Sequence, residues 1–361
     1  MIGSIPDDRV DSADRVAAAG SCCTPGRSRP AAAPVPRRSR SGPTPGAAPG
    51  PDAARRLLAR VGDKERRRCE ALASRVPIPG GGFLMGTDNP DGFPADGEGP
   101  VREVTVSPFL CDAFCVTGYR FARFVAATGY VTEAELFGWS FVFHAHVPEA
   151  VADRYEVREV PGVAWWRGVP GACWAQPEGP GSTLDGRLDE PVAHVSWNDA
   201  VALARFERGR LPTEAEWELA ARGGLEQAIY CWGDDLEPGG EHRCNVWQGA
   251  FPDRDTAEDG YAGRAPVDAF APNGLGLHNS AGNVWEWCAD WFATDHGTGR
   301  VDPTGPARGR GKVMKGGSFL CHHSYCNRYR VGARTANTPD SSTANCGVRL
   351  VFPPDSQEAS S

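Results

Sequence analysis

Residues 210–224 read RLPTEAEWELAARGG, and they carry the clearest helix signal in the chain. Pro212 stands close to the expected helix start, where its missing N–H is harmless. Thr213 and Glu216 have the spacing of a capping box, in which each side chain binds the other residue's backbone N–H. Two glycines follow and end the pattern. The stretch therefore predicts a short, well-capped helix.

The segments around this helix are also short and are separated by turns. WNDAVALARFERG (197–209) and YRFARFVAATG (119–129) have helical spacing, and Asn198 or Asp199 is the expected N-cap of the former. VPIPGGGFLMG (76–86) predicts two strands joined by a glycine turn. The chain also has 44 Gly and 31 Pro. We therefore expect an α+β, loop-rich domain with little regular secondary structure.

Charge and hydropathy exclude several classes of partner. The 361 residues carry a formal net charge of −8, whereas a nucleic-acid-binding surface is normally basic. No apolar stretch is long enough to cross a membrane, and no secretory signal is recognisable. The 12 cysteines are therefore expected to be mostly reduced thiols, as in a cytoplasmic protein.

Composition also divides the chain. RSRPAAAPVPRRSRSGPTPGAAPGPDAA (27–54) has too few large apolar residues to form a core, which is typical of a disordered arm. A short basic helix is expected within residues 54–75. Cys22 and Cys23 lie in the arm, where we recognise no functional motif. The expected divisions are a disordered arm at 1–75, one folded domain at 76–353 and a disordered tail at 354–361.

The sharpest chemical feature is GGSFLCHHSYCNRYR (316–330), in which Cys321 and Cys326 are separated by four residues. Spacing alone leaves three interpretations open. The pair is a disulfide or two buried thiols, or half of a zinc site completed by Cys111 and Cys115, or a redox or copper pair. Thiolates are soft ligands, and two of them suffice for linear Cu(I).

Two other clusters are rich in oxygen ligands. NSAGNVWEW (279–287) contains Asn279 and Glu286, and the region from CNVWQG to TAEDGY contains Asn245 and Asp259. Carboxylates, amide oxygens and free turn carbonyls suit a hard cation such as Ca²⁺. The alternative at each cluster is a polar turn capped by asparagine.

Together these segments resemble the formylglycine-generating enzyme (sulfatase-modifying factor) family. The matching strings run in order from Pro77 to Val351, and the stretch from GGSFLCHHSYCNRYR to NTPDSS is the most specific to the family. The strings are PGGGFLMGTD, TGYVTEAELFGWSFVF, PVAHVSWNDA, RLPTEAEWELAARGG, CNVWQG, APVDAFAPNGLGLHNSAGNVWEWCADW, KGGSFLCHHSYCNRYR and ARTANTPDSS.

The resemblance implies a C-type-lectin-like variant fold and an oxidase. Cys321 and Cys326 would bind Cu(I), with O2 as co-substrate and with Ser318 and Tyr325 organising O2 and substrate. The client would be a sulfatase carrying a Cys-x-Pro-x-Arg peptide, whose cysteine becomes Cα-formylglycine. The enzyme would act as a monomer.

The resemblance also assigns calcium and substrate residues. One structural calcium ion would be held by Asn245, the Val246 carbonyl, Asp259 and the Tyr261 carbonyl. A second would be held by Asn279, the Gly282 and Val284 carbonyls and Glu286. The expected substrate-binding residues are Trp285, Arg334, Ser342, Asn345 and Trp139.

Some positions depart from the family pattern. Ala204 and Leu350 stand where relatives often pair two cysteines, which suits a reducing cytoplasm. Trp139 replaces an acidic or small polar residue near the substrate arginine, and Cys346 replaces leucine. These departures keep an inactive paralogue open as an alternative.

Two further alternatives share the fold. A non-catalytic C-type-lectin-like binding module has no need for Cys321 and Cys326. An iron-dependent sulfoxide synthase of the ergothioneine type adds a helical domain with a His-x3-His-x-Glu motif, which this sequence lacks.

Overall fold

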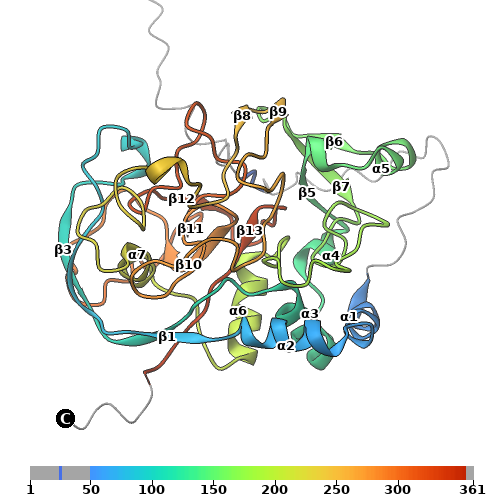
Figure 1. Cartoon of the computed structure of the whole chain (residues 1–361), viewed down its shortest axis with the longest axis horizontal. Helices are drawn as coiled ribbons and strands as arrows, with labels where there is room; N and C mark the ends of the chain where they lie inside the picture. Colours follow the sequence, from blue (N-terminus) through green and yellow to red (C-terminus); the bar gives the residue numbers. More distant parts are fainter. Residues whose placement is uncertain (1–23, 27–48, 355–361) are drawn as a thin grey trace, which may run out of the picture.

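The computed structural model describes residues 24–26 and 49–354, and the expectations for the rest of the chain lie outside the described residues. Helices and strands are short and are joined by long connections (Figure 1). The expected α+β, loop-rich fold is confirmed. Within the described ranges, no helix is long and apolar enough to span a bilayer.

The elements follow one another without a repeating unit. The helices are α1 Gly50–Ala59, α2 Asp63–Ala71, η1 Pro94–Asp96, α3 Gly118–Thr128, α4 Glu133–Phe137, η2 His144–His146, α5 Glu149–Arg154, α6 Trp197–Phe206, α7 Glu214–Arg222 and η3 Pro238–Gly240. The strands are β1 Arg75–Ile78, β2 Gly81–Met85, β3 Arg102–Val106, β4 Phe109–Asp112, β5 Trp139–Phe143, β6 Arg158–Glu159, β7 Trp166–Pro170, β8 Gly249–Ala250, β9 Arg254–Asp255, β10 Trp285–Trp291, β11 Lys312–Lys315, β12 Thr335–Asn337, β13 Cys346–Gly347 and β14 Val351–Phe352.

The central sheet has the order β12-β11-β10-β13. β11 runs antiparallel to β10, and the short β13 runs parallel to it, with Trp285 opposite Cys346. The chain leaves β11 at Lys315 and enters the segment that carries Cys321 and Cys326. The sheet therefore brings the cysteine segment, the GNVWEW strand and the C-terminal segment into one region.

The predicted helix at residue 213 is confirmed as α7. Thr213 Oγ accepts a hydrogen bond from Glu216 N, and Glu216 accepts one from Thr213 N, so the capping box is complete. Gly223 ends the helix with φ 62°, a conformation that favours glycine. α7 packs against β2, β3, β10 and β11 and so supports the central sheet.

The N-cap of α6 differs from the expectation. Ser196, rather than Asn198 or Asp199, caps the helix, because its hydroxyl accepts from Asp199 N at 3.0 Å. Asp199 returns the bond by accepting from Ser196 N at 2.9 Å. The sequence pattern located the helix but placed its cap two or three residues too late.

The expected domain boundary at residue 75 is also too late. α1 and α2 pack against α3, and Leu57, Val61 and Cys69 belong to the largest apolar cluster of the protein. Leu72 lies in a second cluster with Cys115. One basic helix was expected here. The structure has two helices, whose apolar residues are buried against the core while their charged residues face outward. Residues 50–72 are therefore part of the folded domain.

We predict that removing these helices destabilises the domain. A chain starting at Ser74 should unfold with a free energy at least about 3 kcal/mol below that of a chain starting at Pro49, because burial of each large apolar side chain contributes about 1.5–3 kcal/mol. Urea unfolding of the two chains measures the difference. Equal unfolding free energies would show that α1 and α2 are dispensable.

Candidate active site and cation clusters

The structure brings Cys321 and Cys326 together. Their Sγ atoms lie 3.3 Å apart, which is longer than the about 2.05 Å of a disulfide bond. The two residues are 1% and 0% exposed. Backbone bonds hold the turn that joins them, from Cys321 N to Ser318 O at 2.9 Å and from Cys326 N to His322 O at 2.7 Å. The result is a buried pair of closely facing sulfurs.

The zinc interpretation is not supported, because Cys111 and Cys115 lie elsewhere. Cys111 sits on β4 in a different apolar cluster from Cys321. Cys115 donates its thiol to Glu286 Oε1 at 3.0 Å, and burial and the Glu286 charge raise its pKa well above the ordinary value. Across residues 24–26 and 49–354, no three His, Cys, Asp or Glu side chains gather as a metal site.

A buried arginine lies beside the thiol pair. Arg328 Nη1 lies 3.6 Å from Cys326 Sγ, within hydrogen-bond distance of sulfur. Its Nε donates to Asp96 Oδ2 at 2.6 Å, and its guanidinium stacks 3.8 Å above the Phe93 ring. Sequence reasoning missed Arg328, although its position two residues after Cys326 was a readable signal. A guanidinium placed here favours negative charge on sulfur.

Ser318 and Asn345 are joined across the thiol segment. Asn345 Nδ2 donates to Ser318 Oγ at 2.9 Å, and both residues are fully buried. Thr343 Oγ lies 2.6 Å from Asn345 Oδ1 and 2.8 Å from Cys346 Sγ. Burial raises the pKa of Cys346 to about 12. Cys346 therefore stays a protonated core thiol beside this network.

Aromatic side chains form one flank of the site. Tyr325 stacks on Phe251 at 4.5 Å between ring centroids and meets Trp165 edge-on at 4.8 Å. Trp139 packs in the aromatic cluster that includes Phe319 and Leu320 of the thiol segment. Trp285 belongs to the same apolar cluster as the two cysteines and is 0% exposed. Tyr325 thus lies next to Cys326 in the chain, and Trp285 shares the extended apolar core with both cysteines.

The other two expected groove residues have internal partners. Arg334 is 3% exposed and makes a two-pronged ion pair with Glu214, with both distances 2.7 Å. Although burial raises the pKa of Glu214, the Arg334 and Lys315 charges hold it below its usual range. Ser342 Oγ lies 3.0 Å from Ser140 Oγ, which in turn contacts His194 Nδ1 at 2.8 Å. Arg334 is thus a structural cation in this arrangement.

The first oxygen cluster has the features of a cation site. Asn245 is 1% exposed, its Nδ2 donates to Gly263 O at 2.7 Å, and its Oδ1 has no hydrogen-bond partner among the described residues. Asp259 accepts from Val246 N at 3.2 Å and from Tyr261 N at 2.9 Å. Burial raises the pKa of Asp259. The cluster joins the buried Asn245 Oδ1 to a carboxylate that has no arginine or lysine partner among residues 24–26 and 49–354.

The second oxygen cluster lies next to the first, because Gly282 and Asn245 form a β-bridge. Asn279 Oδ1 is buried without a hydrogen-bond partner in the described part of the chain. Glu286, however, pairs with Arg349 through bonds of 2.8 and 3.0 Å and also accepts from Trp217 Nε1 at 2.6 Å. Glu286 and Arg349 are each 1% exposed. The carboxylate of this cluster is therefore already neutralised by an arginine.

The other expected ligands of the second cluster are the backbone carbonyls of Gly282 and Val284. Val284 is buried in the apolar cluster that contains Leu72 and Cys115. Gly282 has φ 71°, and a Cβ there would collide with the Asn245 carbonyl. Glycine is thus required where the two clusters meet.

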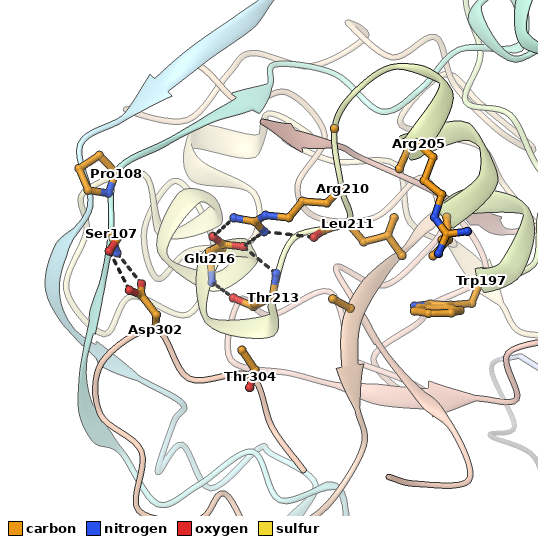
Figure 2. A pocket seen from close by; sticks show the side chains of 14 residues that line it. Ser107, Pro108, Trp197, Arg205, Arg210, Leu211, Thr213, Glu216, Asp302 and Thr304 are labelled. Carbon is orange, nitrogen blue, oxygen red and sulfur yellow. Dashed lines mark hydrogen bonds and ion pairs between the residues drawn. The ribbon is translucent and has the colours of Figure 1, made fainter. Parts of the chain in front are cut away.

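A cavity of about 500 Å³ lies away from these residues, between α6 and the start of α7 (Figure 2). Its walls include Trp197 and Leu211, and an ion pair between Arg210 and Glu216 lies on one side. Asp302 accepts from Ser107 across another part of the lining. None of the predicted site residues lines this cavity.

We predict that Glu286 acts mainly through Arg349. Glu286→Ala should lower the free energy of unfolding by about 3–5 kcal/mol, because it leaves a buried arginine without its partner. The loss should be the same in calcium and in a chelator, measured by urea unfolding. Glu103→Ala, on an exposed position of β3, is the control and should change stability by less than about 0.5 kcal/mol. A loss that disappears in chelator would instead make Glu286 a calcium ligand.

Several known proteins are similar to this chain. Residues 61–353 match the Sulfatase-modifying factor enzyme 1-like domain. The chain is 61% identical to the formylglycine-generating enzyme of Thermomonospora curvata, over 81% of this chain and 98% of that protein. It is 49% identical to the inactive C-alpha-formylglycine-generating enzyme 2 of Mus musculus, over 76% and 84% of the respective chains.

Among solved structures, PvdO from Pseudomonas aeruginosa is similar, with a TM-score of 0.58 and 23% identity over 78% of this chain and 94% of that one. At that identity the likeness concerns the fold alone. The family match covers most of the chain and includes both cysteines. The chain therefore belongs to the sulfatase-modifying factor family, together with the formylglycine-generating enzymes.

Proposed function

We propose that this protein oxidises a cysteine of a client sulfatase to Cα-formylglycine, with Cys321 and Cys326 as copper ligands and O2 as co-substrate. The observation that carries the proposal is the buried pair of sulfurs 3.3 Å apart. It occurs in a chain that is 61% identical to a formylglycine-generating enzyme over nearly the whole of that enzyme.

The donor set fits Cu(I). Thiolates are soft ligands, and two of them complete the linear coordination of the soft cation Cu(I). Structural zinc, by contrast, needs four ligands. When bound, copper supplies the redox chemistry with O2. Burial of both sulfurs keeps bulk water away from that chemistry.

The surrounding residues have separate roles in this proposal. Arg328 offsets the negative charge of the thiolates, because its guanidinium lies 3.6 Å from Cys326 Sγ and is fixed by Asp96. Asn345 orients the Ser318 hydroxyl beside the thiol segment. Tyr325, stacked on Phe251, covers the flank of the site and restricts access to it.

The client is proposed to present its cysteine in a Cys-x-Pro-x-Arg peptide. Trp139, Ser342 and Asn345 are proposed to line the peptide groove. Trp139 packs with Phe319, Asn345 binds Ser318, and Ser342 is bonded to Ser140, the neighbour of Trp139. We also propose that the enzyme works as a monomer in the cytoplasm, where its buried thiols stay reduced.

One structural calcium ion is proposed at the first oxygen cluster. Its donors would be hard oxygens: the buried Asn245 Oδ1, the Asp259 carboxylate and the Val246 and Tyr261 carbonyls. The unpaired Asn245 Oδ1 supports this site, because a cation would satisfy that buried oxygen. At the second cluster a calcium ion would compete with Arg349 for Glu286, and a site there stays a prediction.

The first test of this function is turnover. Protein loaded with Cu(I) under reducing conditions should convert a Cys-x-Pro-x-Arg peptide in air to a product that has lost one sulfur and two hydrogens and gained one oxygen. Mass spectrometry and capture by a hydrazide detect this product. Cys321→Ser and Cys326→Ser should each abolish it, because one thiolate and a hard hydroxyl cannot hold Cu(I).

Cys69→Ser is the matched control, since Cys69 is equally buried but lies on α2, and it should keep turnover. A binding module would retain the peptide without any change of mass. Wild-type turnover in both of the Cys321 and Cys326 variants would refute the copper assignment.

Calcium should stabilise the fold through Asp259. Removing calcium should lower Tm by about 5 °C, because an ion bound at 100 times its Kd contributes about 2.7 kcal/mol. Asp259→Ala should have this lower Tm with or without calcium. Glu258→Ala, the exposed neighbour, should still respond to calcium. Differential scanning calorimetry with added Ca²⁺ or a chelator measures the shift, and an unchanged wild-type Tm would mean that no ion is held.

A further inference from the structure

Residues 24–26 lie against the C-terminal part of the domain, more than 300 positions along the chain (Figure 1, short blue segment). The Thr24 carbonyl accepts from Asn337 Nδ2 at 3.1 Å. The Pro25 carbonyl accepts from Asn337 Nδ2 at 3.2 Å and from Ser341 Oγ at 2.9 Å. Thr24 is 0% exposed, and Pro25 is also buried. These residues are held by two of their backbone carbonyls.

The docking position is connected to the thiol segment. Asn337 ends β12, and Ser341 directly precedes Ser342 in the loop between β12 and β13. The same loop supplies Asn345, whose side chain binds Ser318 of the thiol segment. A peptide held by Asn337 and Ser341 therefore lies on the loop that also organises the cysteine pair.

The docked residues belong to a recognisable sequence motif. Cys23, Thr24, Pro25, Gly26 and Arg27 follow one another as Cys-Thr-Pro-Gly-Arg. This matches the Cys-x-Pro-x-Arg peptide of the proposed client. Cys23 directly precedes the docked Thr24 in the sequence, and Arg27 directly follows Gly26.

We propose that Cys23 is an intramolecular substrate of the chain's own thiol centre and is converted to formylglycine. The inference rests on the proposed function and names a substrate for that same site. Because Cys23 belongs to the same chain as the thiol pair, its reaction would be intramolecular and would need no encounter between two molecules.

The reaction balances with O2 as oxidant and a thiol reductant. The Cys23 side chain loses its C–S bond, one C–H hydrogen and the S–H hydrogen, and its β-carbon gains a C=O bond. O2 takes four electrons, two from the cysteine side chain and two from the reductant, with two protons. The products are the aldehyde, hydrogen sulfide and one water, and two reductant thiols become a disulfide.

The experiment uses the full-length chain, purified without copper and then loaded with Cu(I) in air with a thiol reductant. Peptide mass spectrometry should show that Cys23 has lost one sulfur and two hydrogens and gained one oxygen, and a hydrazide should label the intact chain. The rate per molecule should not change over a dilution series. Asn337→Ala should slow it about fivefold or more, because two backbone carbonyls lose their donor.

Cys22→Ser is the matched control, because Cys22 is one residue out of register with the motif, and conversion of Cys23 should persist. Cys321→Ser should leave Cys23 as a thiol. Pro25→Ala should slow conversion of Cys23 and lower the KM for an added Cys-x-Pro-x-Arg peptide, because the chain's own segment then competes less well.

The outcomes separate this inference from the proposed function. An unmodified Cys23 in a protein that converts the added peptide would overturn the inference alone. Failure to convert either would overturn both. Conversion of Cys23 in Cys321→Ser, or a rate proportional to protein concentration, would also overturn it, since the chemistry would then be nonspecific or between molecules.

Discussion

The buried ion pair of Glu286 and Arg349 ties together the segments on which the site depends. Arg349 binds Glu286 on β10 and also donates to the carbonyls of Asp112, Ala113 and His278. Two stretches far apart in the sequence, residues 112–113 and 278–286, thereby converge on one guanidinium. Short strands alone could not fix them, because each contributes only a few ladder bonds. Both charges are held away from water, so replacing only one of the two residues would leave the other charge buried without a partner.

The same low-dielectric interior affects the ionisation of the buried cysteines. Burial raises the pKa of Cys111, Cys115, Cys231, Cys244, Cys288 and Cys346, so these residues remain neutral thiols and poor ligands for metal. At Cys326 an arginine lies within hydrogen-bond distance of the sulfur, and an aspartate fixes that arginine. Cys115 also has an arginine near its sulfur, with Arg349 Nη2 at 3.7 Å, but that arginine is paired with Glu286, and burial together with the Glu286 charge raises the pKa of Cys115. Cys326 differs because a second sulfur, Cys321 Sγ, lies 3.3 Å from its own.

The sequence predicted those features that depend on contacts between residues close together in the chain. The capping box of Thr213 and Glu216 involves residues three apart, and the helix was found at that place. The pairing of Cys321 with Cys326 also lies within one turn. The partners of Glu286 and Arg334 could not be predicted, because Arg349 and Glu214 are 63 and 120 positions away. A basic helix was expected within residues 54–75, but its packing in the domain was missed for a related reason: α1 and α2 have few apolar residues, and these are buried only by contact with α3 and the core. The Cys-Thr-Pro-Gly-Arg sequence was readable, but its context resembled a structureless arm.

The contact between Thr24 and Asn337 spans 313 positions, which gives it a place in the timing of synthesis. At about 5–20 residues per second, Asn337 leaves the ribosome about 15–60 seconds after Thr24. No earlier part of the nascent chain supplies the Asn337 and Ser341 donors, so the segment stays without these partners until residues 337–341 have been synthesised. A contact of this kind forms late in biogenesis, after most of the folded domain has left the ribosome.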